Sequence, residues 1–504
     1  DTVKQIQLFH RSGAYPYQIM LLSFTPNFRH FIHRQSVYHA PYWSCFDAIQ
    51  QIRRKKAMVL SFHDLNWPQG IEFVYTPFVI LAMLNNEKYA QIEFGEDGNP
   101  IQIDMYKNGV ICRRNLYDDR GFVSGSIVYK NAKPLYQDYL MENGLVKMRQ
   151  FIQDGHVEIN QQYCQYLLRY EDKEIEKTFA KIRYDKLDDV IFEVLSSYIE
   201  LTKREDIFCI AMHERHAVLL NRVLSNKKKI LTFFENRYDI LKRPEVKEMI
   251  EKADYVITDS QRNSQLIKMV MDNEELHNIA DITPYDSRVD FGISQQLTIQ
   301  KILVPVDSIG EEIFKELIYY LGKYLLTNPN AQIHLFTRSA EYNRKSRLLE
   351  KTRHYLGQFG MEEAWAVEES NKVSENGFGD DLVSSESIPI RFVVEQCVDE
   401  LSVSKCMREQ RVIVDMREIS ELYLRIAAIS VGIPQIVRTE TKFVEHQKNG
   451  MVIKDIKELP SKLDFYLNGL NNWNEAMIYS YELGKKYTTS VLVDKWKEVI
   501  DFVE

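Results

Sequence analysis

The sequence predicts an α/β protein with two Rossmann-like domains and an antiparallel β-sheet inserted in the first. Two observations support this prediction. In two stretches of the chain, strands that are apolar on both faces alternate with helices, which is typical of parallel sheets covered by helices. The first stretch is interrupted at residues 70–160, where short apolar runs are separated by turn signals, as in antiparallel hairpins.

Composition excludes several classes of protein. At 504 residues the chain is long enough for two or three domains, each with its own core. The net charge of −8 argues against a general nucleic-acid binder. The longest apolar run, residues 78–84, is far shorter than the roughly 18–20 residues of a membrane span. The six cysteines form no CxxC pair, so we expect reduced thiols, no metal and no cofactor.

The first 69 residues alternate helix and strand. We expect an amphipathic helix over 1–12, a strand over 17–24, a helix over 46–55 and a strand over 57–62. Because doubly wound folds usually open with a strand rather than a helix, we expect the native chain to begin upstream of this sequence.

Residues 70–160 are expected to form about seven antiparallel strands. Asn-Gly and Asp-Gly pairs supply the positive φ angles that tight hairpins need. Six turn signals divide the segment: Asn85-Asn86, Asp97-Gly98, Asn108-Gly109, Asp119-Arg120-Gly121, Asn143-Gly144 and Asp154-Gly155.

The alternation of strand and helix returns after residue 186. The predicted strands cover 206–212, 229–234, 255–258, 301–306, 332–337, 391–394, 412–414 and 435–437, with helices at 244–252, 311–326 and 472–503. The polar, acidic segment 366–389 is expected to be a mobile surface loop. We therefore predict an N-terminal domain over 1–69 plus 161–295, the meander over 70–160, a C-terminal domain over 296–475, and a C-terminal helix over 476–504.

The most informative stretch is residues 412–453, VIVDMREISELYLRIAAISVGIPQIVRTETKFVEHQKNGMVI. Its order of strand, helix, Gly-Ile-Pro, strand and Glu445…Asn449-Gly450 resembles the donor-sugar half of retaining GT-B glycosyltransferases. The resemblance implies a GT-B-like fold whose last helix crosses back to the first domain. It also implies two glutamates eight positions apart, but those places hold Ile419 and Ala427.

The diphosphate side of the predicted donor site also departs from the GT-B pattern. Active relatives place an arginine and a lysine just after the first strand of the second domain, whereas no basic residue stands between Ile302 and Phe314. Asp307, Glu311 and Glu312 stand there instead, and their carboxylates repel a diphosphate. We therefore expect a glycosyltransferase-like fold that is not an enzyme.

Three further runs resemble one family more closely. They are SCFDAIQQIRRKKAMVLSFHDLNWPQGIEFVYTPFVIL, LYDDRGFVSGSIVYKNAKPLYQDYL and KKILTFFENRYDI. Together they resemble the first accessory secretory protein family of the accessory Sec system. The resemblance implies a cytoplasmic protein that works with the second and third accessory secretory proteins, an accessory SecA-type motor ATPase and a serine-rich-repeat glycoprotein adhesin as the exported substrate.

Five residues are candidates for a binding site in the cleft between the two predicted domains. His213 and Arg215 follow the strand 206–212, and open α/β sheets bind ligands at that edge. Arg438 and Thr439 follow the strand 435–437, and Glu445 belongs to the Glu…Asn-Gly pattern. A purely structural role also fits each of them. His213 and Arg215 fit a solvated helix start, Arg438 and Thr439 fit a polar strand end, and Glu445 fits a turn stabilised by its own residues.

Basic runs at 53–56 and 227–229 allow two interpretations: solvated helix ends, or a peripheral contact with an anionic membrane. The leading functional prediction is a non-catalytic scaffold or adaptor in an export complex. An active glycosyltransferase with an atypical donor site and a glycan-binding module that recognises the glycosylated substrate are the alternatives.

Overall fold

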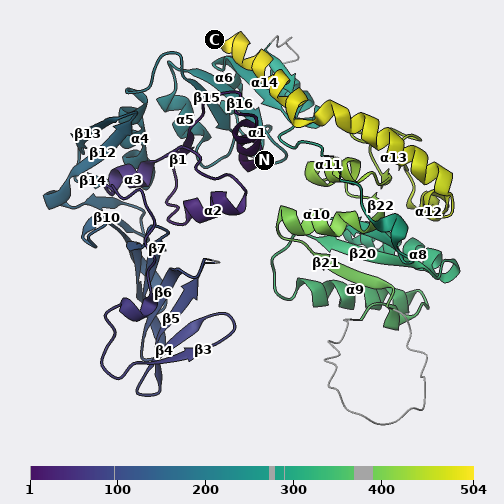
Figure 1. The fold of residues 1–504 in the computed structure, drawn as a ribbon, viewed down its shortest axis with the longest axis horizontal. Coiled ribbons are helices and arrows are strands. Elements are labelled where there is room, and N and C mark those ends of the chain that lie inside the picture. The colour runs from purple at the N-terminus through teal and green to yellow at the C-terminus, as the bar shows by residue number, and fades with distance from the viewer. Residues whose placement is uncertain (1, 96, 272–277, 289, 368–389) are drawn as a thin grey trace. The chain divides into compact units, whose positions relative to one another are not determined.

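The computed structural model describes residues 2–95, 97–271, 278–288, 290–367 and 390–504 (Figure 1). Most of the expected loop 366–389 lies outside the described residues. The chain forms two compact units. The first comprises Asp1–Thr258, Ser264–Ala280 and Glu498–Glu504, and the second Asp259–Asn263 and Asp281–Lys497. The predicted four-part division of the chain stays a prediction.

The N-terminal segment of the first unit begins with the expected helix. The elements in order are α1 (Thr2–Ser12), β1 (Ile19–Leu21), α2 (Phe28–Arg34), β2 (Tyr42–Ser44) and α3 (Cys45–Ile49). β1 pairs with β2 in parallel. The strand predicted over 57–62 is wrong, because this segment forms no ladder and leaves Met58 and Val59 58% and 90% exposed.

A ten-stranded sheet follows, in which every described pair is antiparallel. Its spatial order is β14-β11-β10-β9-β8-β7-β6-β5-β4-β3, so strands β3 to β11 follow one another in space as in sequence, and β14 pairs with β11. The strands are β3 (Glu72–Tyr75), β4 (Ile80–Leu84), β5 (Glu87–Phe94), β6 (Pro100–Lys107), β7 (Val110–Asp118), β8 (Phe122–Lys130), β9 (Lys133–Leu140), β10 (Val146–Phe151), β11 (Val157–Ile159) and β14 (Arg183–Tyr184).

Nine of these strands, β3 to β11, lie within 70–160, whereas seven were expected. Two turns account for the difference. The β3–β4 turn closes through the hydroxyl of Thr76, which donates to the carbonyl of Val79. The β8–β9 turn uses Asn131 and Ala132 at φ angles of 51° and 59°. Alanine rarely adopts a positive φ, so the sequence carries no turn signal there.

The rest of the first unit contains a four-stranded sheet in the order β15-β16-β17-β18, in which β15, β16 and β17 run parallel, and a separate hairpin of β12 and β13. The strand predicted over 255–258 is confirmed, and β17 has the same bounds. The elements are β12 (Gln165–Tyr170), β13 (Lys173–Thr178), α4 (Leu187–Ile199), β15 (Ile207–Ala211), α5 (Ala217–Val223), β16 (Lys228–Phe233), α6 (Glu245–Glu251), β17 (Tyr255–Thr258), α7 (Gln261–Val270) and β18 (Ile279–Asp281).

The second unit is built on a six-stranded sheet in the order β21-β20-β19-β22-β23-β24, with every pair parallel. Figure 1 shows α9 on one face and α10 and α11 on the other. The strands are β19 (Gln300–Pro305), β20 (Ala331–Thr337), β21 (Phe392–Gln396), β22 (Gln410–Asp415), β23 (Gln435–Val437) and β24 (Gly450–Val452). The helices of this unit are α8 (Glu311–Thr327), α9 (Arg344–Gln358), α10 (Glu400–Arg408), α11 (Leu422–Val431), α12 (Leu459–Leu467) and α13 (Leu470–Gly484). The last helix, α14 (Thr489–Val503), is divided between the units, since Glu498–Glu504 belong to the first.

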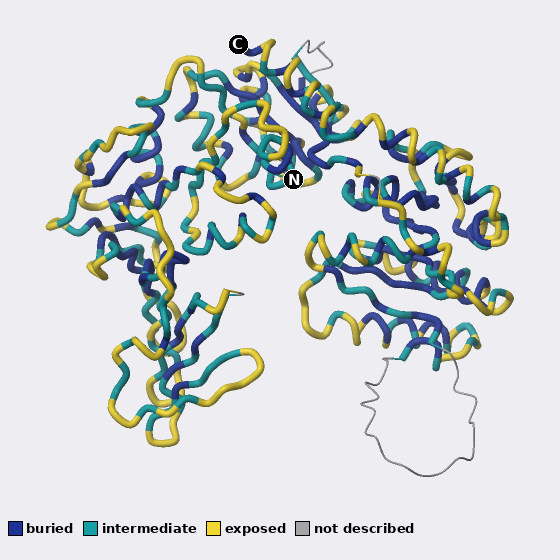
Figure 2. The backbone as a smooth tube through the Cα atoms, in the orientation of Figure 1, coloured by how far each residue is buried: buried dark blue, intermediate teal, exposed yellow. Residues whose placement is uncertain are grey.

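The core of the second unit lies where these helices cover the sheet. Its central strands are almost wholly buried (Figure 2), and Ile302, Ile333 and Val412 are 0% exposed. Burial on both faces explains why these strands are continuous apolar runs in the sequence. Among the described residues, no helix has the length and hydrophobicity that crossing a membrane requires.

Candidate functional site

The candidate site is the carboxyl edge of the second unit's sheet, where the strand order reverses. Numbered along the chain, the six strands stand in the order 3-2-1-4-5-6, so β19 and β22 are neighbours although two strands separate them in sequence. In open α/β sheets, ligands bind outside the carboxyl ends of the strands at such a switch point. Two carboxylates lie there: Asp415 ends β22, and Asp307 follows β19.

Asp307 is bound to the end of the neighbouring strand β20. Its carboxylate accepts hydrogen bonds from the Thr337 hydroxyl at 2.7 Å and from the Arg338 backbone N–H at 2.6 Å. It also accepts one from the Arg344 guanidinium at 3.1 Å. This carboxylate is therefore held in place, and its charge is shared with Arg344.

Asp415 is fully buried and lies between two arginines. It accepts two hydrogen bonds from Arg417, at 2.8 and 2.9 Å, and one from Arg425 at 3.3 Å. Burial raises the pKa of Asp415, but attraction to Arg425 and the bonds from Arg417 outweigh burial and hold the pKa below its ordinary value. The carboxylate is thus ionised and paired with both guanidinium groups, and that of Arg425 also donates to Gln435 Oε1 at 3.2 Å.

A fourth ion pair lies at the same edge. The guanidinium of Arg338 lies 3.3 Å from the carboxylate of Glu421, and it donates to the carbonyl of Asp399 at 3.1 Å. Burial raises the pKa of Glu421. Glu421 precedes α11, two residues beyond Ile419, which is 48% exposed in the preceding loop. The other expected glutamate position, Ala427, packs against the core of the unit.

The basic groups at this edge were not predicted. No basic residue stands between Ile302 and Phe314, whereas Arg338, Arg344 and Arg417 come from segments that follow β20 and β22. The signal was present, since Arg338 and Arg417 each stand one or two residues after a strand. These arginines do not form an open cradle, because each is paired with a carboxylate of the same edge.

Three predicted site residues lie in the second unit. Arg438 directly follows β23, and its Nη1 atom is buried without a hydrogen-bond partner among the described residues. Thr439 is exposed. Glu445 accepts from the Tyr479 hydroxyl and pairs with Lys448, while its backbone N–H donates to Asn449 at 2.9 Å. Glu445 therefore has structural partners, and Arg438 has an unused donor.

The other two predicted site residues lie in the first unit. His213 is half-buried between β15 and α5, and its Nδ1 accepts from the Arg215 backbone N–H at 3.1 Å. Arg215 is exposed. His216, stacked on His213, donates from Nε2 to the Ala211 carbonyl at 2.8 Å, and burial lowers its pKa. These contacts build the start of α5, and a cleft shared by all five residues stays a prediction.

The basic runs make many contacts within the first unit. Arg53 pairs with Glu174 and Glu176 at 2.7 and 2.8 Å. Lys229 is buried and donates to the Leu224 carbonyl at 3.0 Å. Lys227 donates to the Thr202 carbonyl at 3.0 Å. Basic side chains that are paired or buried in this way are attracted less strongly to an anionic membrane.

One group of side chains among the described residues could hold a metal ion. The ligand atoms of Glu395, Cys397 and Cys406 all lie within 4.8 Å of one another. This group was not predicted, because the two cysteines are nine positions apart and match no common metal motif.

Comparison with known proteins identifies the family. The sequence matches the family described as "Accessory Sec system protein Asp1" over residues 1–502. The chain belongs to this family. A relative of the same name from Streptococcus gordonii is 30% identical over 99% of this chain and 93% of its own length.

Solved structures agree with this assignment. The Gap123 glycosylation-associated protein complex of Streptococcus agalactiae matches with a TM-score of 0.79 and 28% identity, covering 99% of this chain and 93% of that chain. The structure of accessory secretory proteins 1, 2 and 3 of Streptococcus pneumoniae matches with the same TM-score and 26% identity, covering 100% and 93%. Members of the Asp1 family thus occur in complexes with the second and third accessory secretory proteins.

The fold is GT-B-like, as the sequence predicts. The pneumococcal O-GlcNAc transferase GtfA, solved with UDP and GlcNAc, matches with a TM-score of 0.71, covering 100% of this chain and 95% of that chain. At 12% identity this likeness concerns the fold alone. The Asp1-family chain thus combines a glycosyltransferase-like fold with a switch point filled by ion pairs.

Proposed function

We propose that this chain is a non-catalytic scaffold of the accessory Sec export complex, needed for export of a glycosylated serine-rich-repeat adhesin. One observation supports the proposal that the chain is not catalytic. The arginines at the switch point are already paired with Asp307, Asp415 and Glu421. A donor site needs free positive charge or helix N-termini at the diphosphate.

The energetic cost of opening this edge supports the proposal. A nucleotide diphosphate would have to displace carboxylates from guanidinium groups that are 8% exposed or less, as Arg417 and Arg425 are. Breaking a buried pair by removing one partner costs about 3–5 kcal/mol. The negative charges of Asp307 and Asp415 would also repel the diphosphate. Little net free energy of binding would therefore remain.

The family assignment supports the partners of the proposal. We propose that the chain binds the second and third accessory secretory proteins, and that the complex delivers the adhesin to the accessory SecA-type motor ATPase. This places the protein in the cytoplasm, with peripheral contact at the inner face of the membrane. The paired basic runs favour contact through partner proteins over direct attraction to lipid.

Glycan binding is a second candidate function, and Arg438 favours it. A buried guanidinium N–H without a partner costs free energy, which a ligand oxygen would recover. The exposed hydroxyl of Thr439 stands next to it. A weak carbohydrate site of this kind is compatible with a scaffold that recognises a glycosylated substrate.

Calorimetry with a panel of UDP- and GDP-sugars tests the non-catalytic part. We expect dissociation constants weaker than about 1 mM, since each missing charge-assisted hydrogen bond removes about 1.5–3 kcal/mol. A micromolar constant or turnover of the donor would establish an active transferase with an atypical site instead. A pull-down from native cytosol with mass spectrometry tests the scaffold part, which fails if neither accessory secretory partner co-purifies.

A further inference from the structure

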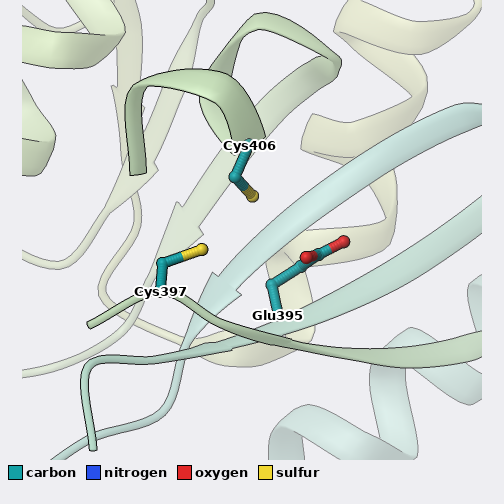
Figure 3. Close-up of side chains that lie close together, drawn as sticks. All are labelled: Glu395, Cys397 and Cys406. Carbon is teal, nitrogen blue, oxygen red and sulfur yellow. The ribbon is translucent and has the colours of Figure 1, made fainter. Parts of the chain in front are cut away.

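We infer that Glu395, Cys397 and Cys406 form a Zn²⁺ site that links the end of the edge strand β21 to helix α10. Figure 3 shows the side chains of the three residues converging from these two segments. Their ligand atoms all lie within 4.8 Å of one another. Two thiolates bound tetrahedrally to one zinc at about 2.3 Å lie roughly 3.8 Å apart, so small side-chain rotations complete the geometry.

The backbone fixes this convergence. Glu395 and Cys397 are two residues apart along an extended segment, so their side chains leave the same face of the sheet. The N–H of Cys397 donates to the Thr337 carbonyl at 2.9 Å and continues the ladder with β20 beyond the end of β21. Cys406 belongs to α10, which crosses that face before β22. Cys397 is 4% exposed, so its thiol is held within the unit.

Neighbouring groups orient the carboxylate ligand. The Glu395 Oε1 atom lies 2.8 Å from Nδ1 of His334, which is buried. The other ring nitrogen of His334 lies 2.9 Å from the Gln332 Oε1 atom, and the Gln332 amide donates to the Ile390 carbonyl at 3.0 Å. A carboxylate held by such a chain of hydrogen bonds is a pre-positioned metal ligand.

The ligand atoms of these three residues favour zinc over other metal ions. Two thiolates favour zinc over magnesium or calcium, and a carboxylate completes a set of three protein ligands. Binding releases the two thiol protons, so affinity rises with pH. A fourth coordination position is left for water or for a group from a partner protein.

The site also adjoins the ion-paired edge described above. The Cys397 carbonyl accepts from Arg338 at 3.4 Å, and Arg338 holds Glu421. An ion that fixes Cys397 would therefore fix the backbone beside the switch point. The proposed scaffold function does not use the three zinc ligands. The zinc site and the scaffold function can therefore be disproved independently.

The test uses the full-length chain, reduced and freed of metal, with Zn²⁺ and Co²⁺ as probes. We expect one ion per chain, and sulfur-to-cobalt charge-transfer bands together with tetrahedral ligand-field bands. Cys397→Ser and Cys406→Ser should each weaken binding by about 100-fold, and Glu395→Gln by about 10-fold with the charge-transfer band retained. Cys112→Ser, which alters a half-buried thiol in β7, is the matched control and should change nothing.

A second measurement covers variants that fail to fold. In the wild-type chain, bound zinc should protect two thiols from alkylation, and mass spectrometry should locate both at Cys397 and Cys406. The inference is overturned if zinc binds at well below one ion per chain or if cobalt gives no charge-transfer band. Protection of other cysteines, or undiminished binding in the Cys397→Ser/Cys406→Ser double variant, overturns it equally.

Discussion

The guanidinium of Arg417 folds back onto the carboxylate of Asp415, two residues earlier, with hydrogen bonds of 2.8 and 2.9 Å. Asp415 ends the strand at the switch point of the second sheet, and Arg425 reaches the same carboxylate from α11. The position at which a glycosyltransferase-like fold would receive a ligand is thus occupied by the chain's own charges.

Asp415→Ala should destabilise the second unit by about 3–5 kcal/mol, because it leaves Arg417 and Arg425 buried without their anion. Urea unfolding, with hydrogen exchange of β22 as a local measure, checks this. Glu482→Ala removes the exposed partner of Lys485 and should have little effect. Equal effects of the two substitutions would show that the buried network does not stabilise the fold.

Asp119 should make the stability of the first unit depend on pH. Its carboxylate accepts from the backbone N–H groups of Arg29 and His30 at 2.8 and 3.2 Å. Burial, with a smaller contribution from Asp118, raises its pKa from 3.8 to about 6. Since the folded state binds this proton more tightly than the unfolded state, the stabilisation is complete below pH 3.8 and is lost as the pH rises to 6.

Asp119→Asn should remove this dependence while its amide oxygen keeps both hydrogen bonds. Near neutral pH the variant should be more stable than the wild type, by up to the order of 3 kcal/mol, and the difference should vanish near pH 4. Urea unfolding at a series of pH values measures it. Asp64→Asn changes an exposed carboxylate of the same unit and serves as the control. A pH-independent difference between Asp119→Asn and wild type would contradict the assignment.

Arg438→Ala should weaken binding of a glycopeptide that carries N-acetylglucosamine. We expect a response at millimolar ligand in the wild type and about a tenfold loss in the variant, because one charge-assisted hydrogen bond is removed. NMR or thermal-shift titration measures both. Lys454→Ala, at an exposed lysine of the same unit, is the control. An unchanged response in Arg438→Ala would exclude this site.

The free edge of the ten-stranded sheet should bind the third accessory secretory protein. β3 is the last strand at one end of that sheet, and among the described residues it pairs only with β4. Its end and the following turn expose Tyr75 (65%) and Phe78 (90%). An unpaired edge with exposed aromatic residues favours addition of a partner strand. The other interpretation is that the sheet only braces the first unit.

Tyr75→Asp combined with Phe78→Ser should reduce co-purification of that partner at least tenfold. Leu145→Asp, which changes an exposed apolar residue elsewhere on the same unit, is the control. Hydrogen exchange of β3 and β4 should slow in the complex. If binding survives the double substitution and these strands gain no protection, the docking surface lies elsewhere.

The sequence by itself determined the elements whose signals are local. β17 and β23 lie where they were predicted, because short runs of apolar residues bounded by polar ones are strands in a buried parallel sheet. Gly432 ends α11 with a φ of 76°, as the Gly-Ile-Pro turn indicates. The strand count failed at two turns, and at the β8–β9 turn the reason is that an alanine with positive φ, Ala132, carries no local signal.

Tertiary structure alone decided which charges and ligands meet. Arg344 and Asp307 are 37 positions apart, and the pairing of β19 with β20 brings together the segments that follow these two strands. Cys397 and Cys406 match no common spacing, yet a strand end and a helix place their thiols side by side. The sequence determines which chemical groups the side chains carry. The distances between side chains depend on the order of the strands and the crossing of the helices, and these depend on burial throughout the unit.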